Sequence, residues 1–444
     1  MLTPRWSPAF AGVIVTLLAA APVQAQVLTI AQATHEVLTH NSALRAGAAD
    51  VAASDAAVVA ARAGWFPRIT VDESWQRGNQ PGFVFGSLLA SRRFAATDFA
   101  IDALNRPVAL DFHRASVGVE QPVFDPRTGA DVERARLGRD AARLTLDDTR
   151  AGLAVSTAET YGRLVAAEAA RQAVDAALAA ARADRRRAAD RRDAGMATDA
   201  DVLALDAHVA TLAQRAVQAD GDATIARAQL NRLMGAPIER TYQVIIAPPP
   251  APASGAADLQ ALWAEAEAAR PELRRAAVLD QLARSDVRRA RAELLPRVLS
   301  QAGVEVSGTR FDERASSWLV GAEVRWSLSL GGAERAQLTA AARAREKAAA
   351  DAAEVRAAAR VDVVAAVTRQ RSASARLAAG SAAVAQARES ERIVRDRFEA
   401  GFAGVTDLLR AQGAVLDADA NRTAAMVDAL VSAATLDRAL GRHP

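Results

Sequence analysis

A short glycine-centred phrase occurs twice in the chain, and this repetition restricts the possible folds more than any other feature. Residues 193–203 read DAGMATDADVL, and residues 399–409 read EAGFAGVTDLL. The two phrases lie 206 positions apart, and the same spacing relates Gly235 to Gly441. Two other blocks match in the same order at different spacings: Pro67-Arg68 with Pro296-Arg297, and Val117-Gly118 with Val320-Gly321. Ordered internal matches of this kind predict two tandem structural repeats whose lengths differ only between the matching blocks.

The predicted duplication divides the chain into four segments. Residues 1–25 have Arg5, an apolar stretch and Val23-Gln24-Ala25, a pattern typical of an export signal peptide. The first repeat is predicted as 26–246, a Pro/Ala-rich linker as 247–257, and the second repeat as 258–444. The linker contains APPPAPASG, which cannot continue a helix or a central strand.

Both repeats are predicted to contain the same series of elements. A helix comes first, two strands follow, and a long helix without proline leads to the glycine phrase and a returning helix. The predicted helices cover 29–63, 130–192 and 199–234, and then 258–293, 333–398 and 405–440. The glycine phrase is therefore predicted to be a helix–turn–helix tip, with Asp199 or Thr406 capping the returning helix.

The first long helix has two apolar stripes. Small and apolar residues step by four and three positions, which is typical of a coiled-coil seam. A second stripe on another face predicts that the helix has neighbours on two sides. The seam consists of Leu137, Ala141, Leu144, Asp148, Ala151, Val155, Ala158, Gly162 and Val165, and the second stripe of Leu146, Leu153, Tyr161 and Leu164.

The predicted strands alternate between apolar and polar residues. The clearest runs from Val320 to Leu330 and has its apolar residues at every second position, while Pro122 in the first repeat predicts an edge, a bulge or a strand end. Strands of about 8–11 residues are long enough to cross a bilayer when tilted. No second sheet is predicted that could cover their apolar face.

These strands favour a membrane β-protein over a soluble one. Within a bilayer only a closed barrel leaves no unpaired strand edge, and the smallest barrels need about eight strands. Four strands in each chain therefore predict an oligomer, and three protomers would supply a 12-strand transmembrane β-barrel. Twelve of the nineteen aromatic residues lie in 65–124 and 311–326, around the strands, as is usual at membrane interfaces. The alternative is a soluble α+β protein with a small four-stranded sheet on a helical bundle.

At this point the pattern resembles the TolC-like outer-membrane channel proteins of tripartite efflux pumps and type I secretion. The resemblance is based on the tandem plan, the two tip phrases, and QPVFD at 121–125 followed by Gly129. It implies an α+β homotrimer with a 12-strand barrel in the outer-membrane lipid, continued by a long periplasmic α-helical coiled-coil barrel. It also implies a periplasmic adaptor protein and an inner-membrane transporter as partners. The function implied is export through this channel-tunnel to the exterior.

The resemblance also assigns roles to residues at the two tips. Gly195, Met196, Gly401 and Phe402 become the contacts to the adaptor protein. Carboxylates on the returning helices are directed toward the entrance of the tunnel in this family, which implies that role for Asp201 and Asp407.

Arg410 departs from the family pattern. Some relatives carry a second aspartate at that position, one helical turn after the position of Asp407, so Arg410 makes the entrance less selective for cations or pairs with Asp407. The alternative is that Asp407 only caps or pairs on a helix face.

Other functional classes have little support in the sequence. The net charge of +3 is too balanced for a nucleic-acid binder, and five scattered histidines with no cysteine predict no metal site. No catalytic or cofactor-binding constellation is recognisable, so no enzyme is predicted. The basic run ADRRRAADRRD at 183–193 is interpreted as a solvated helix face with i,i+4 Asp–Arg pairs, or alternatively as a contact to an acidic adaptor surface. The alternative function is a non-transporting periplasmic coiled-coil scaffold of the envelope.

Overall fold

The computed structural model describes residues 27–245 and 258–442. The predicted signal peptide, 1–25, and the whole of the predicted linker, 247–257, lie outside these residues. The chain is a helix-dominated α+β protein, as the sequence predicts. No helix in the described ranges is both long and apolar enough to cross a membrane.

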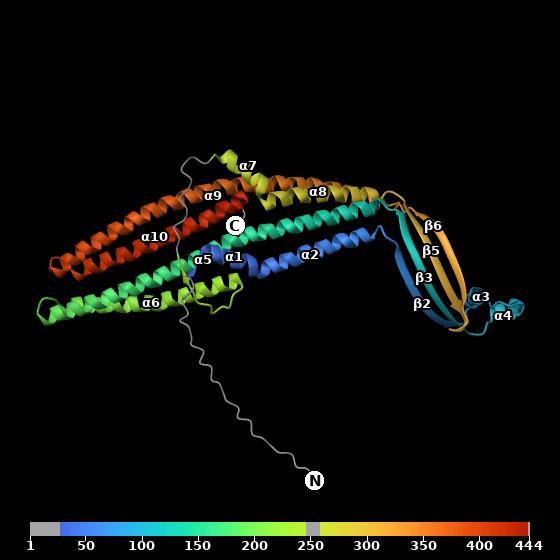
Figure 1. The fold of residues 1–444 in the computed structure, drawn as a ribbon, viewed down its shortest axis with the longest axis horizontal. Helices are drawn as coiled ribbons and strands as arrows, with labels where there is room; N and C mark the ends of the chain where they lie inside the picture. Colours follow the sequence, from blue (N-terminus) through green and yellow to red (C-terminus); the bar gives the residue numbers. More distant parts are fainter. Residues whose placement is uncertain (1–26, 246–257, 443–444) are drawn as a thin grey trace, which may run out of the picture. The chain divides into compact units, whose positions relative to one another are not determined.

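The two halves of the chain contain a similar series of elements (Figure 1). The first half consists of β1 (Val27–Leu28), α1 (Ile30–His40), α2 (Ser42–Ala63), β2 (Arg68–Gly78), α3 (Pro81–Ala90), η1 (Ala96–Phe99), α4 (Ile101–Asn105), β3 (Leu110–Phe124), α5 (Pro126–Asp193), α6 (Asp199–Met234) and β4 (Gln243–Val244). The second half consists of α7 (Leu259–Ala269), α8 (Pro271–Ala292), β5 (Arg297–Gly308), β6 (Ala315–Arg325), α9 (Ala333–Glu399) and α10 (Val405–Leu440).

The returning helices have the predicted bounds, but each predicted first helix is two helices. Asn41 interrupts the first, because its side chain accepts a hydrogen bond of 2.8 Å from the backbone N–H of Ala43 and caps α2. Arg270 interrupts the second, because Pro271 begins α8 and holds the residue before it in an extended conformation.

The strand predicted to reach Leu330 ends at Arg325 instead. Arg325 pairs with Arg297, the first residue of β5, so residues 326–330 have no partner residues on that strand. Gly332, with φ of 73°, then turns the chain into α9, and the carboxylate of Glu334 accepts a hydrogen bond of 3.0 Å from the backbone N–H of Ser329.

The four long strands form one antiparallel sheet in the order β2-β3-β5-β6 (Figure 1). The register shifts between Pro122 and Phe124, so the proline marks a bulge. Rows of apolar residues cross all four strands on one face: Ile69–Val119–Ala302–Val320 and Val71–Val117–Val304–Trp318. Across the next rows the residues are mainly polar or glycine, including Arg68–Glu120–Gln301–Gly321 and Asp72–Ser116–Glu305–Ser317.

The chain forms two compact units, and both halves of the chain contribute to each of them. The described part of one unit comprises 27–39, 157–245 and 376–430, and includes both helix tips; the other comprises 40–156, 258–375 and 431–442, and includes the sheet. In the sheet-containing unit a core forms where α7, α9 and α10 meet, around Ala266, Val363 and Leu440.

Both predicted stripes of α5 contain buried positions. Along the seam Leu144, Ala151, Ala158 and Val165 are buried, and along the second stripe Leu146, Tyr161 and Leu164 are buried. Small residues permit close helix contacts, since a Cβ at Gly162 would lie 2.5 Å from a methyl carbon of Val427 in α10. The two-sided packing of this helix is therefore confirmed.

Candidate functional site

The two glycine phrases form turns of the same type. Gly195 and Gly401 have φ values of 76° and 81°, in the left-handed region that glycine adopts without strain. The N–H of Gly195 bonds the carbonyl of Arg192, and the N–H of Met196 bonds that of Arg191, both at 2.8 Å. The second phrase has the equivalent bonds from Gly401 to Phe398 and from Phe402 to Arg397. Both long helices therefore end in Schellman motifs, and the predicted turns are confirmed.

Four helices pack together just behind these turns. The cluster has a small apolar core to which α5, α6, α9 and α10 all contribute, so the two tips belong to one assembly. Its members are Ala188, Val202, Leu205 and Val405, with Ala204, Phe398 and Leu409 packed against them.

A direct hydrogen bond joins the ends of α5 and α9. The guanidinium Nη1 of Arg191 lies 3.0 Å from the carbonyl oxygen of Phe398, which also accepts the turn bond from Gly401. The same guanidinium lies 5.6 Å from the centroid of the Phe398 ring, within the range of a cation–π contact. Arg191 therefore binds a carbonyl that the end of α9 cannot satisfy fully by itself.

At the first tip the helix cap differs from the predicted one. Thr198, and not Asp199, is the N-cap of α6. The backbone N–H of Asp201 donates a 3.3 Å bond to the Thr198 hydroxyl oxygen, and the Asp201 carboxylate accepts a 3.1 Å bond from the Thr198 N–H, which makes a reciprocal capping box. The spacing of Thr198 and Asp201 resembles the sequence signature of such a box, so this cap has a local signal that the prediction of Asp199 did not use. Asp201 is thus held to its own helix end.

The equivalent carboxylate at the second tip is arranged differently. Gly404 occupies the position that corresponds to Thr198, so no side-chain hydroxyl is available there, and α10 starts at Val405 rather than after a Thr406 cap. Asp407 instead forms an ion pair of 3.1 Å with Arg410. The side chains of both residues are more than half exposed, at 54% and 74%. A solvated pair of this kind contributes little to stability, so both charges remain available at the surface.

The side chains at the apices of both turns are exposed. Met196 is 66% exposed and Phe402 is 85% exposed, although the residues immediately behind them are packed. Both turns therefore present an apolar side chain to solvent.

The basic run at 183–193 is largely paired across helices rather than within α5. Arg185 pairs with Asp206 of α6 at 2.8 Å, Arg191 binds Phe398 of α9, and Arg187 pairs with Asp184 within α5. Asp184 is buried and also accepts a 2.8 Å hydrogen bond from Gln412 of α10. The predicted i,i+4 pattern is therefore wrong in detail, because most of these arginines join α5 to its neighbours.

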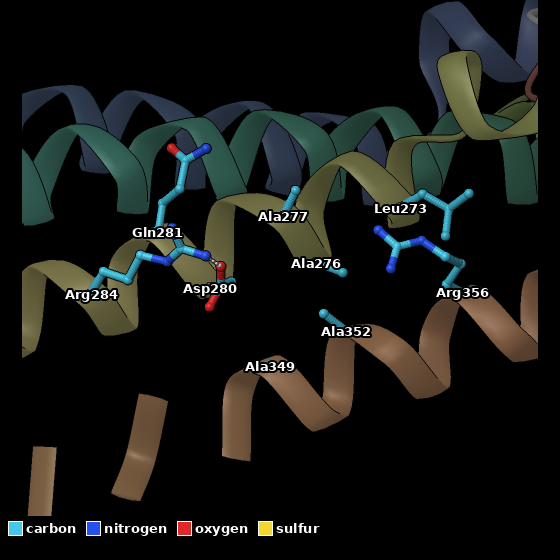
Figure 2. A pocket seen from close by; sticks show the side chains of 9 residues that line it. All are labelled: Leu273, Ala276, Ala277, Asp280, Gln281, Arg284, Ala349, Ala352 and Arg356. Atoms are coloured by element: carbon cyan, nitrogen blue, oxygen red, sulfur yellow. Dashed lines mark ion pairs between the residues drawn. The ribbon is translucent and has the colours of Figure 1, made fainter. Parts of the chain in front are cut away.

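A different kind of groove lies in the sheet-containing unit. Figure 2 shows α8 and α9 on either side of a groove of about 290 Å³ with Ala276, Ala277, Ala349 and Ala352 along it. Its charged residues have partners: Asp280 pairs with Arg284 at 2.6 Å, and Arg356 with Glu267 at 3.4 Å. Among the described residues there is no cluster of His, Cys, Asp or Glu suited to a metal ion.

The fold is similar to those of outer-membrane channels of known structure. A structure described as the outer-membrane channel OprN is 23% identical, with a TM-score of 0.75, and the match covers 93% of this chain and 89% of the other. The CmeC channel of Campylobacter jejuni is 14% identical with a TM-score of 0.79, over 93% and 86% of the two chains. VceC of Vibrio cholerae is 19% identical with a TM-score of 0.74, over 93% and 96%.

The sequence itself identifies the family. The search of curated proteins found no significant match. The sequence profile of the family described as outer membrane efflux protein, however, matches residues 33–236 and 262–442, which is most of the chain. Members of that family are channels and not enzymes. The chain therefore belongs to the outer membrane efflux protein family.

Proposed function

We propose that three copies of this chain assemble into a channel-tunnel that exports substrates across the outer membrane. Family membership supports the efflux channel role. The proposal adds a 12-strand barrel in the outer membrane, a periplasmic tunnel of long helices, and a working complex with a periplasmic adaptor protein and an inner-membrane transporter. The two similar halves of the chain are interpreted as tandem repeats, and the helices of the two repeats alternate around the tunnel.

The apolar face of the sheet carries this proposal. Ile69 is 65% exposed, Val71 75%, Trp318 78% and Val320 68%, although they stand in continuous rows across hydrogen-bonded strands. No described element covers these residues. An apolar sheet face of this extent needs a lipid or protein environment, since exposed apolar patches on soluble proteins are small. Lipid fits best, because the opposite face is mainly polar or glycine, as in the wall of a water-filled barrel.

The edges of the sheet support oligomerisation. Within the described residues, β2 and β6 each have a neighbouring strand on one side only. Unpaired edges in hydrocarbon leave backbone groups without hydrogen bonds, at a cost of several kcal/mol for each group. Pairing of β6 in one protomer with β2 in the next satisfies both edges, and three protomers close a barrel of twelve strands.

The helix tips are proposed as the periplasmic entrance and the adaptor contact. The apices present Met196 and Phe402 as exposed apolar groups, which suits contact with a protein partner. Asp407 and Arg410 present opposite charges beside them. We assign Asp201, Asp407 and Arg410 to the entrance, with Asp201 less free to move because of its capping box.

A charge on the apolar face tests the function most simply. Val320 lies in the middle of β6, is 68% exposed and is aligned with Ala302 on β5. Val320→Arg would place a cation in the hydrocarbon at a cost of about 2–4 kcal/mol near the midplane, in each of the proposed three copies. The native protein should be a heat-modifiable trimer in the outer-membrane fraction, and this variant should be depleted from it.

Ser317→Arg is the matched control, because residue 317 is an exposed position on the opposite face of β6, beside Glu305 of β5. Its yield should stay close to that of the native protein. If Val320→Arg reaches the outer membrane as well as Ser317→Arg does, the sheet does not face lipid. A non-transporting periplasmic scaffold would then be the better reading.

A further inference from the structure

A second groove lies in the unit that contains the tips. Unlike the groove between α8 and α9 in Figure 2, it contains a cation without an ion-pair partner. It has a volume of about 640 Å³, and α5, α6, α9 and α10 all contribute to it. This volume lies within the range of sites that bind drug-sized molecules.

The surface of α5 that forms the floor of the groove is mainly apolar, and its side chains are short. Successive turns of α5 present alanine side chains to it, together with Gln172, so a flat apolar body could approach the helix closely along the alanines. The floor residues are Ala169, Ala173, Ala176, Ala177 and Ala180, and Val415 and Leu416 of α10 extend the apolar lining.

Three arginines line the same groove, and two of them have carboxylate partners. Arg388 pairs with Asp419 at 3.1 Å, and Arg395 pairs with Glu391 at 2.5 Å. All four of these residues line the groove. Within each pair the positive and negative charges therefore nearly cancel.

Arg422 is the third arginine, and it remains uncompensated. In the described part of the chain no carboxylate forms an ion pair with it, and its buried Nε atom has no hydrogen-bond partner. The Nε atom of Arg395 is also buried without a partner. The backbone at Arg422 is held close to α9, since a Cβ at Gly380 would lie 3.3 Å from its Cα atom. Arg422 is therefore a partly buried cation without a carboxylate partner, and a bound anion would compensate its charge.

The remaining polar groups of the groove do not supply that anion. Gln412 donates to Asp184. Burial lowers the pKa of His208, and Arg215 lowers it further against the opposing effect of Asp184, so the imidazole is neutral at neutral pH. The groove therefore has a net charge close to +1 above an apolar floor.

We propose that this groove binds an amphipathic monoanion, with a carboxylate or sulfonate on Arg422 and Arg395 and an apolar ring system on the alanines of α5. The guanidinium of Arg422 would supply the unpaired charge for the anion, and Arg395 lines the same groove. A ligand seated there touches four helices at once. This site is separate from the proposed entrance, and its occupation does not depend on the transport role.

The test uses the full-length protein in a non-ionic detergent and 2-naphthalenesulfonate as the probe. Isothermal titration calorimetry should show saturable binding, and the neutral analogue 2-naphthalenemethanol corrects for partition into micelles. Arg422→Gln should weaken binding at least about tenfold, the effect expected when a hydrogen bond to a charged group is lost. Arg422→Lys keeps the charge and should retain part of the affinity. Ala173→Leu places a larger side chain in the groove and should also weaken binding.

Arg182→Gln is the matched control. Arg182 is an exposed arginine of α5 outside the groove lining, and this change should leave the affinity unaltered. The folded state of each variant is checked by its melting temperature, which Arg422→Gln should not lower, because the native Nε has no partner to lose. The proposal is overturned if the sulfonate binds no more tightly than the alcohol, or if Arg422→Gln and Arg182→Gln bind it equally well.

Discussion

Arg191 Nη1 donates a hydrogen bond of 3.0 Å to the carbonyl oxygen of Phe398, and this bond joins the end of α5 to the end of α9. Both residues lie within one turn of a glycine that reverses the chain, so the two tips are connected at their bases. If the tips form an entrance, separation of α5 from α9 requires this bond to break.

Loss of the Arg191 bond should therefore loosen the entrance. Arg191→Ala removes the hydrogen bond and the ring contact, an effect on the order of 1 kcal/mol in each chain for a partly exposed bond. Single-channel recordings in planar bilayers should show more frequent or larger openings than in the native protein. Arg186→Ala is the control, because Arg186 is an exposed neighbour on α5 for which the described residues provide no ion-pair partner. Identical traces from both variants would mean that the bond does not restrain opening.

The pair of Asp407 and Arg410 gives a prediction about ion selectivity. If these side chains face the lumen, Arg410→Asp would replace a mixed ring by two carboxylate rings, and preference for cations should increase. Divalent cations added from the tip side should then block the current. Asp407→Ala should instead raise conductance by removing the paired charges. Unchanged selectivity and conductance in both variants would show that the pair only occupies an outward helix face.

Phe402 should affect export but not assembly. Its ring is 85% exposed, so Phe402→Ser removes little packing within the protomer. We expect a normal yield of assembled protein and loss of export, measured as accumulation of a transported dye in cells that carry the cognate pump. Phe402→Leu keeps an apolar apex and should retain most of the export. Wild-type export by Phe402→Ser would exclude Phe402 as an adaptor contact.

The only two tyrosines give opposite stability predictions. The Tyr161 hydroxyl is 2.9 Å from the carbonyl oxygen of Leu28 and 2.8 Å from that of Ile245, and it donates to one of them at a time. The buried Tyr242 hydroxyl has no partner among the described residues. Tyr161→Phe should therefore destabilise the protein by about 1–2 kcal/mol, whereas Tyr242→Phe should be neutral or slightly stabilising. Equal losses in thermal denaturation would contradict this difference.

The same tyrosines set a limit at alkaline pH. Burial raises the pKa of Tyr242 to about 12. In the unfolded chain the phenol loses its proton near pH 10, so the folded state binds the proton more tightly. The stabilisation is complete below about pH 10 and is lost as the pH rises toward about 12. Melting temperatures should fall over this interval, and less steeply in Tyr242→Phe.

Much of the fold could be predicted from the periodicity of apolar residues and from the positions of glycine and proline. Four helices end just before a glycine in the left-handed conformation, and these ends match the sequence pattern closely: the glycines are 195, 235, 401 and 441. The match is close because this conformation strongly favours glycine at the position after a helix. The ends of the strands were less predictable. The alternation from Val320 continues to Leu330, but strand length depends on the partner, and β5 begins only at Arg297.

The positions of the two helix turns were predicted, but the contacts around them were not. The exposed apices and the Asp407–Arg410 spacing could be read from the local sequence. The capping box at Thr198 was readable too, since it is a local motif. The bond from Arg191 to Phe398 and the unpaired Arg422 depend on how helices far apart in sequence pack together, and the local sequence around each arginine carries no signal for either.

The most direct test of the proposed channel is disulfide cross-linking of the two sheet edges. The chain has no cysteine, so introduced pairs report without background. Within one protomer β3 and β5 separate β2 from β6, by about three strand spacings or 14 Å, which is too far for a disulfide. Ile69→Cys on β2 is combined in turn with Val320→Cys, Ala322→Cys and Val324→Cys on β6, and each single variant is the control. Closure by three protomers predicts that at least one pair, on oxidation in membranes, gives covalent dimers and trimers that the single variants do not give. Monomers alone from every pair would contradict an intermolecular β2–β6 edge and, with it, the trimeric channel.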